Sequence, residues 1–190
     1  IAPHSTDVVW GDFPEDTACG LCYTSGTTGD PKGVLYSHRS NVMHTMIGLQ
    51  KDAIGIGAAD TTLPVVPMFH ANAWGLAFSG PATGSKLVLP GAKMDGESIY
   101  ELLENEKVTF TAAVPTVWLM LLQYLESTNK KLPHLNRVVI GGSAVPERIL
   151  RALEENYEVE VVHAWGMTEM SPLGSLGSMT AGVIAQDHDT

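Results

Sequence analysis

The sequence predicts an α/β protein with a mainly parallel sheet flanked by helices. Short apolar runs alternate along the chain with segments of helical periodicity, at the spacing that strand–helix–strand units need. The chain has 190 residues, of which 44% are hydrophobic and 17% charged. That length is enough for one packed domain, and that composition excludes a disordered chain.

The predicted strands are short apolar segments bounded by turn residues. The continuous apolar run 18–23 is typical of a buried strand, and 33–36 resumes after a turn rich in glycine and threonine. The later strand candidates are 62–66, 86–89, 108–114, 137–140 and 159–162. Parallel sheets bind ligands beyond the carboxyl ends of their strands. We therefore expect the functional residues in the loops that follow these strands.

The first predicted helix begins at a serine cap, Ser37 or Ser40. Its apolar residues are Val42, Met43, Met46, Ile47 and Leu49. Residues 71–78 then predict a helix of small side chains. Both helices precede the longer strand–helix alternation of the second half.

Three further helices have recognisable starts. Asp95 caps a helix whose buried face is formed by Ile99, Leu102 and Leu103. Pro115 begins a helix that is apolar on every side, which is typical of burial within a larger body. Pro146 opens the last helix at a favoured first position.

The charge of the chain limits its partners. Lys and Arg number 11 against 21 Asp and Glu, which gives a net charge of −10. This sign argues against nucleic acid or an anionic membrane as the main partner, although a phosphate site needs only local donors. There is no apolar run of membrane-spanning length and no signal peptide, so we expect a cytoplasmic protein. The start at Ile1 and the polar end 186–190 suggest a piece of a longer chain.

The only cysteines, Cys19 and Cys22, form a C-x-x-C pair. A zinc site needs a second ligand pair, and none is evident. Residues three apart on a strand point to opposite faces. We expect two small buried core residues; the alternative, a thiol redox protein, would be dismissed by a normal cysteine pKa.

Residues 23–33 have the composition of a phosphate-binding loop, with four hydroxyl side chains besides Tyr23, three glycines and a lysine. Glycines let backbone N–H groups approach an anion, hydroxyls add donors, and lysine adds charge. The loop is not a Walker A motif, because the spacing from Gly26 to Lys32 differs and no Ser or Thr follows Lys32. The alternative is a plain hairpin tip rich in turn-forming residues.

Four motifs in order resemble adenylate-forming enzymes, which include acyl-CoA synthetases, luciferases and peptide-synthetase adenylation domains. Residues 23–33 resemble their phosphate-loop signature, and 67–75 (Pro-Met-Phe-His-Ala-Asn-Ala-Trp-Gly) resemble the motif that borders the acyl pocket. Residues 141–144 resemble the glycine loop that lies against the adenine and acyl groups. Residues 163–169 resemble the aromatic-Gly-x-Thr-Glu motif, with Trp165 where tyrosine is commoner. The second motif is most similar to medium-chain acyl-CoA synthetases and methylmercaptopropionate-CoA ligases.

The resemblance implies an acid–thiol ligase that uses ATP and CoA. In this family a carboxylate attacks the α-phosphorus of ATP, pyrophosphate leaves, and a thiol attacks the acyl-adenylate, so the protein mainly positions groups and neutralises charge. Lys32, Thr168 and Glu169 would be the catalytic residues, with Thr168 donating to the α-phosphate and Glu169 holding Mg²⁺. ATP would be bound by Thr24, Ser25, Gly26, Thr27, Thr28, Gly29, Lys32, Gly142, Ser143, Ala144, His163, Ala164, Trp165, Gly166, Met167 and Thr168.

The carboxylic acid would be bound by His70, Trp74 and Gly141. On a helix, residues four apart share a face, so His70 would lie near the carboxylate and Trp74 further along the acyl chain. A structural histidine and a core tryptophan are the alternatives. Ser143 does not fit a serine-hydrolase nucleophile, because Val145 takes the place of the last glycine in Gly-x-Ser-x-Gly.

Nothing after Glu169 resembles the family's ribose-binding acid, hinge, or small C-terminal domain with its lysine. The resemblance therefore implies that residues 1–190 are the central part of the N-terminal AMP-binding domain, without the C-terminal domain, and inactive alone. A nucleotide-binding module without ligase chemistry is the alternative, because the same loop could serve it. Medium-chain or short thioether acids are the expected substrates, while the oligomeric state stays open.

Overall fold

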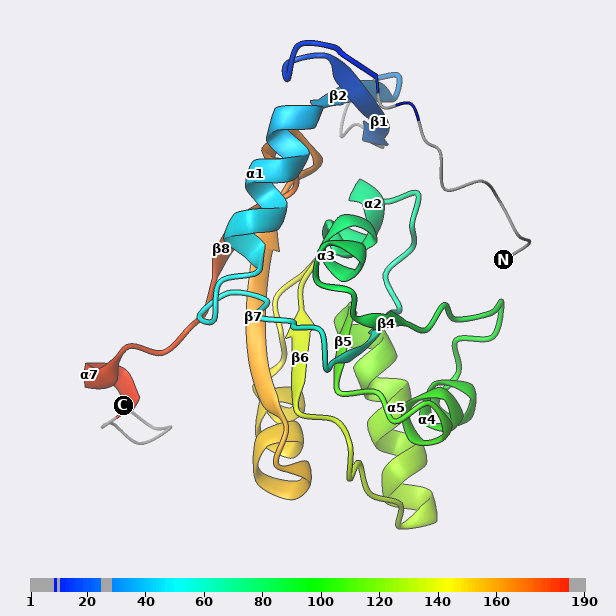
Figure 1. The fold of residues 1–190 in the computed structure, drawn as a ribbon. Helices are drawn as coiled ribbons and strands as arrows, with labels where there is room; N and C mark the ends of the chain where they lie inside the picture. The colour runs from blue at the N-terminus through cyan, green and yellow to red at the C-terminus, as the bar shows by residue number, and fades with distance from the viewer. Residues whose placement is uncertain (1–8, 10, 25–28, 185–190) are drawn as a thin grey trace.

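The main sheet has six strands in the order β4–β3–β5–β6–β7–β8 in the computed structural model, which describes residues 9, 11–24 and 29–184 (Figure 1). Neighbouring strands from β4 to β7 are parallel, and β8 is antiparallel to β7. The strands are β3 (Thr61–Pro64), β4 (Lys86–Leu87), β5 (Phe110–Ala113), β6 (Arg137–Ile140), β7 (Glu160–Gly166) and β8 (Leu173–Leu176). The predicted α/β fold with a mainly parallel sheet is confirmed.

The strands contribute side chains to a core on each face of the sheet. In β6, Val138 and Ile140 belong to one core and Val139 to the other, as strand alternation requires. The first core is covered by α4 (Gly96–Asn105), α5 (Pro115–Thr128), α6 (Glu147–Arg151) and the π-helical turn Ala152–Asn156. The second is covered by α2 (Ala71–Trp74) and α3 (Leu76–Thr83), while α1 (His38–Gly48) packs against α3.

The predicted caps of two helices are confirmed. Ser37 Oγ accepts a hydrogen bond from the Ser40 backbone N–H at 3.1 Å, so Ser37 is the cap of α1. Asp95 accepts from the Ser98 backbone N–H at 2.9 Å, and this bond, with a second from the Ser98 hydroxyl, lowers the pKa of Asp95. Pro146 precedes rather than begins its helix, because α6 starts at Glu147.

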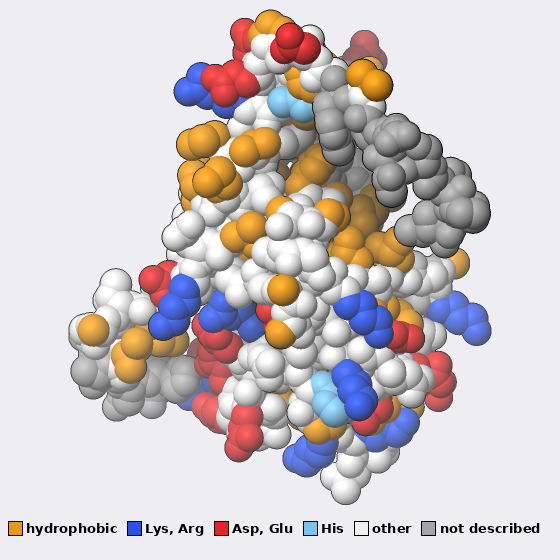
Figure 2. Space-filling model, viewed as in Figure 1, with side chains coloured by type: hydrophobic (Ala, Val, Ile, Leu, Met, Phe, Trp, Pro, Cys, Tyr) orange, Lys and Arg blue, Asp and Glu red, His pale blue; other side chains and the backbone are white. Residues whose placement is uncertain are grey.

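Helix α1 leaves a hydrophobic surface exposed. Its buried residues are Asn41, Thr45 and Gly48. By contrast, its apolar side chains at 42, 43, 46 and 47 are 50 to 61% exposed, and Figure 2 shows hydrophobic side chains on the surface over this helix. In the described part of the chain, no helix combines the length and the apolar character that a membrane crossing requires.

Strands β1 (Ala18–Thr24) and β2 (Lys32–Ser37) form a separate antiparallel hairpin, which Figure 1 shows apart from the main sheet. The prediction of a buried strand at 18–23 is wrong: Leu21 is 53% exposed. A hairpin that pairs only with itself has one face to bury, and that face carries Cys22. Cys19 is exposed, so the expectation of two buried cysteines is also wrong.

The predicted helix 71–78 is interrupted. Residues Ala71–Trp74 have φ between 48 and 57°, which makes a left-handed turn, and α3 begins only after Gly75. A left-handed residue other than glycine costs roughly 1–2 kcal/mol, so tertiary contacts must stabilise this turn. Backbone strain of this kind is concentrated at functional sites in proteins.

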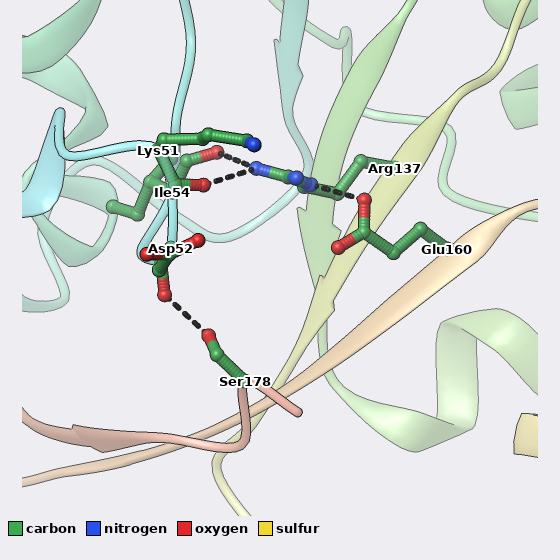
Figure 3. Close-up of polar contacts among 6 residues, drawn as sticks. All are labelled: Lys51, Asp52, Ile54, Arg137, Glu160 and Ser178. Carbon is green, nitrogen blue, oxygen red and sulfur yellow. Dashed lines mark hydrogen bonds and ion pairs between the residues drawn. The ribbon is translucent and has the colours of Figure 1, made fainter. Parts of the chain in front are cut away.

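Arg137, the first residue of β6, holds the loop after α1 by hydrogen bonds (Figure 3). Its Nη1 donates to the carbonyls of Lys51 and Ile54 at 3.3 and 3.1 Å, and its Nε donates to Glu160 at 2.7 Å. A Cβ at Gly55 would lie 2.4 Å from that Nη1 and would displace the guanidinium, and the φ of +66° at this position also favours glycine. These bonds hold the loop that carries Ile54, whose side chain belongs to the second core.

Candidate active site

A cavity of about 490 Å³ lies where β5, β6 and β7 end, as expected for a parallel sheet. Four segments that are distant in sequence surround it: the β1–β2 hairpin, the turn at 70–74, the loop after β6, and the segment from β7 to β8. The predicted site residues that line it are Thr24, Lys32, His70, Trp74, Gly141, Gly142, Ala164, Trp165, Gly166, Met167, Thr168 and Glu169. The four sequence motifs therefore meet in one place.

Other predicted residues are not part of this wall. Gly29, Ser143, Ala144 and His163 do not line the cavity, so their role in ATP binding stays a prediction. His163 precedes Ala164 in β7, and alternate residues of a strand point to opposite faces. Ser25, Gly26, Thr27 and Thr28 lie outside the described residues.

The hairpin positions the lysine of the phosphate-type loop. Thr24 and Lys32 are the last cross-strand pair, so residues 25–31 form the connection between the strands. Lys32 lines the cavity, and its side chain makes no ion pair with the residues that the structure describes. No carboxylate among them therefore competes with an anionic ligand for its ammonium group.

The segment between β7 and β8 presents Thr168 and Glu169 as a short 3₁₀ turn, Thr168–Met170. The turn is closed by a hydrogen bond from Met167 N–H to the Pro172 carbonyl at 2.9 Å. A Cβ at Gly166 would lie 2.3 Å from that carbonyl oxygen, so glycine is needed for this close approach. Thr168 is buried, whereas Glu169 is exposed at the cavity.

A tyrosine from β2 touches this turn. The Tyr36 hydroxyl donates to the Thr168 carbonyl at 2.6 Å, although 132 residues separate them. Burial raises the pKa of Tyr36 to about 12, with smaller contributions from Cys22 and the Glu169 carboxylate. The phenol therefore stays a hydrogen-bond donor throughout the physiological pH range.

Trp165 and Trp74 present indole rings at two positions of the cavity wall. Trp165 is 54% exposed, and a Cβ at Gly174 would lie 2.7 Å from its ring, so the ring packs over the bare backbone of β8. Trp74 is only partly buried and lies against the loop after β6, where a Cβ at Gly141 would be 3.2 Å from the indole. A flat, half-exposed ring of this kind can bind a planar or apolar group.

The helical spacing predicted for His70 and Trp74 is wrong, yet both side chains line the cavity. The left-handed turn at Ala71–Trp74, rather than a helix face, brings them there. His70 is exposed, and Trp74 is partly buried and packs against the second core.

Sequence reasoning missed the apolar wall of the cavity. Its residues come from the second core and are Ile54, Leu76, Phe110, Ala112, Val139, Leu173 and Leu176. For those on strands the only signal is strand alternation, which identifies a buried face but does not show that this face borders an open space. Because hydroxyl, ammonium and carboxylate groups line the same cavity, it suits a ligand with an anionic part and an apolar part.

Comparison with known proteins agrees with the motifs. Residues 6–189 match the family model of the AMP-binding enzymes. The medium-chain-fatty-acid–CoA ligase of Ectopseudomonas oleovorans is 51% identical over 95% of this chain and 33% of its own length. The 3-methylmercaptopropionyl-CoA ligase of Ruegeria lacuscaerulensis is 50% identical over 92% of this chain and 32% of its own length. The chain thus spans about a third of the curated relatives that it matches.

Solved structures share the fold. The inhibitor-bound N-terminal domain of FACL13 from Mycobacterium tuberculosis superposes with a TM-score of 0.81 at 26% identity, covering 92% of this chain and 43% of that one. A long-chain-fatty-acid-CoA ligase from Archaeoglobus fulgidus gives a TM-score of 0.71 at 29% identity, over 83% of this chain and 33% of that one. The fold, the four motifs in one cavity and the family match agree that the chain belongs to the AMP-binding enzymes.

Proposed function

We propose that this chain is the central part of the N-terminal AMP-binding domain of an ATP-dependent acyl-CoA synthetase. The reaction joins a carboxylic acid to CoA and converts ATP to AMP and pyrophosphate. The observation that best supports this proposal is that Lys32, Thr168 and Glu169 line the same cavity as a set of apolar side chains. The relatives at about 50% identity carry the names of CoA ligases, which supports the same activity.

The polar residues of the cavity suit a triphosphate. Lys32 and the hydroxyl of Thr24 would hold the β- and γ-phosphates together with the loop 25–29, and Thr168 would donate to the α-phosphate. Trp165 would stack on the adenine. These groups neutralise charge that moves onto pyrophosphate as the carboxylate attacks the α-phosphorus, which is the main task of a protein in phosphoryl-type transfer.

The Glu169 carboxylate suits a Mg²⁺ ion that would also be bound by phosphate oxygens of the substrate. The described residues contain no group of three or more His, Cys, Asp and Glu side chains that could hold a metal by themselves. Mg²⁺ usually takes one or two carboxylates and completes its shell with water and substrate phosphates. When bound, the ion would neutralise phosphate charge, and the Glu169 carboxylate would hold it there.

The apolar wall would take the hydrocarbon part of the acid. His70 would lie beside the carboxylate, with Trp74 and Gly141 at the start of the acyl channel, and Phe110 and Val139 would line it further in. We propose medium-chain or short thioether acids as substrates, since the relatives at about 50% identity include ligases named for both classes.

The proposed function is tested by pyrophosphate exchange in the full-length protein that contains this chain. A panel of carboxylic acids from C4 to C14, with 3-methylmercaptopropionate added, should show exchange that depends on the acid and is strongest for medium-chain or thioether acids. Tight ATP binding without exchange for any acid would overturn the proposal and support a nucleotide-binding module instead.

Replacing Trp74 with alanine should shift the preference of the full-length enzyme toward longer acids. Trp74 lines the cavity and its indole lies against Gly141, so its removal opens space beside the glycine loop. Each additional buried CH₂ contributes up to about 0.8 kcal/mol, a few-fold in kcat/KM. The measurement is kcat/KM over the C4 to C14 series.

Trp118→Ala is the matched control, because this indole is fully buried in the core on the other face of the sheet. It should destabilise the protein by roughly 3–5 kcal/mol and lower activity equally for every acid. A similarly uniform loss for Trp74→Ala would show that Trp74 does not border the acyl channel.

The 190-residue chain alone should produce no acyl-adenylate from ATP, Mg²⁺ and octanoate. It spans about a third of the length of its curated relatives, and we expect adenylation to need parts of the protein beyond this third. Mass spectrometry of the reaction mixture checks this expectation, with the full-length protein as positive control. Detection of octanoyl-AMP with the short chain would show that residues 1–190 suffice for adenylation.

A further inference from the structure

Two side chains outside the four motifs form hydrogen bonds with the segment 168–173, one at its first residue and one at its last. We propose that Tyr36 and His44 are positioning residues for this segment, and that their effect is on the binding of Mg²⁺ and ATP. This inference rests on the proposed function, because it concerns the roles that Thr168 and Glu169 have in it.

Tyr36 fixes the start of the segment. Its hydroxyl donates at 2.6 Å to the carbonyl of the peptide bond that joins Thr168 to Glu169. The tyrosine is 2% exposed, so little water is available to replace this bond. Rotation of that peptide would take the carbonyl away from the Tyr36 hydroxyl, and the buried hydroxyl opposes the rotation because this bond would be lost.

His44 fixes the end of the segment. Its Nε2 accepts a hydrogen bond from the Leu173 backbone N–H at 3.2 Å, where β8 begins. Burial lowers the pKa of His44, which favours the neutral ring that can accept this bond. The ring also packs against Gly75, where a Cβ would lie 2.6 Å from Cε1. His44 therefore contacts both β8 and the glycine that follows the turn carrying Trp74.

The two contacts come from one continuous stretch that begins at Lys32. Strand β2 carries Lys32 and Tyr36, and α1 follows directly with His44. The lysine of the phosphate-type loop is thus connected through a strand and a helix to both ends of the Thr168–Glu169 segment. Loss of either contact should affect the groups that face the triphosphate more than those that face the acyl chain.

The test uses conservative variants of the full-length protein. Tyr36→Phe removes only the hydroxyl, and His44→Leu removes the acceptor at similar volume. In each, we expect the Mg²⁺ concentration for half-maximal pyrophosphate exchange and the KM for ATP to rise roughly 2- to 12-fold, as for one lost hydrogen bond. The KM for the acid should stay within about 2-fold in Tyr36→Phe. In His44→Leu, where the lost ring also packs against Gly75 beside Trp74, it should rise less than the KM for ATP. His44→Gln keeps an acceptor at the end of the side chain and should recover part of the loss.

Matched controls remove equivalent groups elsewhere. Tyr124→Phe deletes a hydroxyl that accepts from Lys130 on the far side of the sheet, and His134→Leu deletes a histidine whose Nε2 lies 3.8 Å from a Glu104 carboxylate oxygen. Both should leave the Mg²⁺ and ATP parameters unchanged. A second readout, the Kd of Mg·ATP by calorimetry, should weaken in Tyr36→Phe and His44→Leu and not in the controls.

A double-mutant cycle separates positioning from general stability. In a Glu169→Gln background, Tyr36→Phe should have little further effect on the Mg²⁺ requirement, because the group that it positions has lost its charge. Fully additive effects, an equal rise of every KM, or unchanged Mg·ATP binding would overturn the inference while leaving the synthetase proposal intact. If the wild-type protein shows no exchange with any acid, the proposed function itself is overturned. In that case the Kd of Mg·ATP, measured by calorimetry, decides whether Tyr36 and His44 position a nucleotide site.

Discussion

Lys32→Ala should lower pyrophosphate exchange by the full-length protein roughly 10- to 150-fold. A hydrogen bond to a charged group contributes about 1.5–3 kcal/mol, and each 1.4 kcal/mol is a factor of ten. The side chain lines the cavity and has no ion-pair partner among the described residues, so its charge is available to the β- and γ-phosphates. Because Lys32 is exposed, its removal should change the free energy of unfolding by less than about 0.5 kcal/mol.

The control for Lys32→Ala is Lys93→Ala, which removes an exposed lysine that does not line the cavity. Lys32→Arg keeps the charge with a different shape and should retain part of the activity. Steady-state exchange and ATP affinity are both measured. Undiminished adenylation by Lys32→Ala would remove this lysine from the site.

Glu169→Gln should markedly raise the Mg²⁺ concentration needed for half-maximal exchange. The variant keeps the size of the side chain and exchanges a charged oxygen ligand for a neutral one, which a hard cation binds more weakly. Since Glu169 is exposed at the cavity, the fold should be unaffected. The measurement is a Mg²⁺ titration of exchange at saturating ATP and acid.

Glu101→Gln provides the comparison, because Glu101 is an exposed carboxylate on α4 that does not line the cavity. Its Mg²⁺ titration should coincide with that of the wild type. If the curve for Glu169→Gln also coincides, the carboxylate does not hold the ion.

Features that depend on neighbours in sequence were predictable. Ser37 and Asp95 cap their helices through hydrogen bonds to a backbone N–H three residues later, so the cap residue and its partner are local. The β-strands of the parallel sheet follow from short apolar runs of the right spacing. Glycine, hydroxyl and lysine chemistry in 23–33 likewise needs no knowledge of the fold to indicate an anion site.

The four motifs and their order were also evident from the sequence, and they were enough to predict the family. What the motifs could not show is which of their residues reach the cavity. Gly141 and Gly142 of the glycine loop line the cavity, whereas Ser143 and Ala144 of the same loop do not line the cavity. Membership in a motif follows from sequence, whereas access to a ligand depends on the position of the backbone.

The sequence by itself thus determined the fold class, the helix caps and the chemical groups of the site, because these depend on local hydrogen bonds and on residue type. Only the tertiary structure decided the left-handed turn at Ala71–Trp74, since small residues favour a right-handed helix unless distant packing reverses the preference. It also decided that Tyr36 and His44 meet a segment more than 120 residues away. Such contacts arise from how sheet and helices pack, and no local pattern along the chain records them.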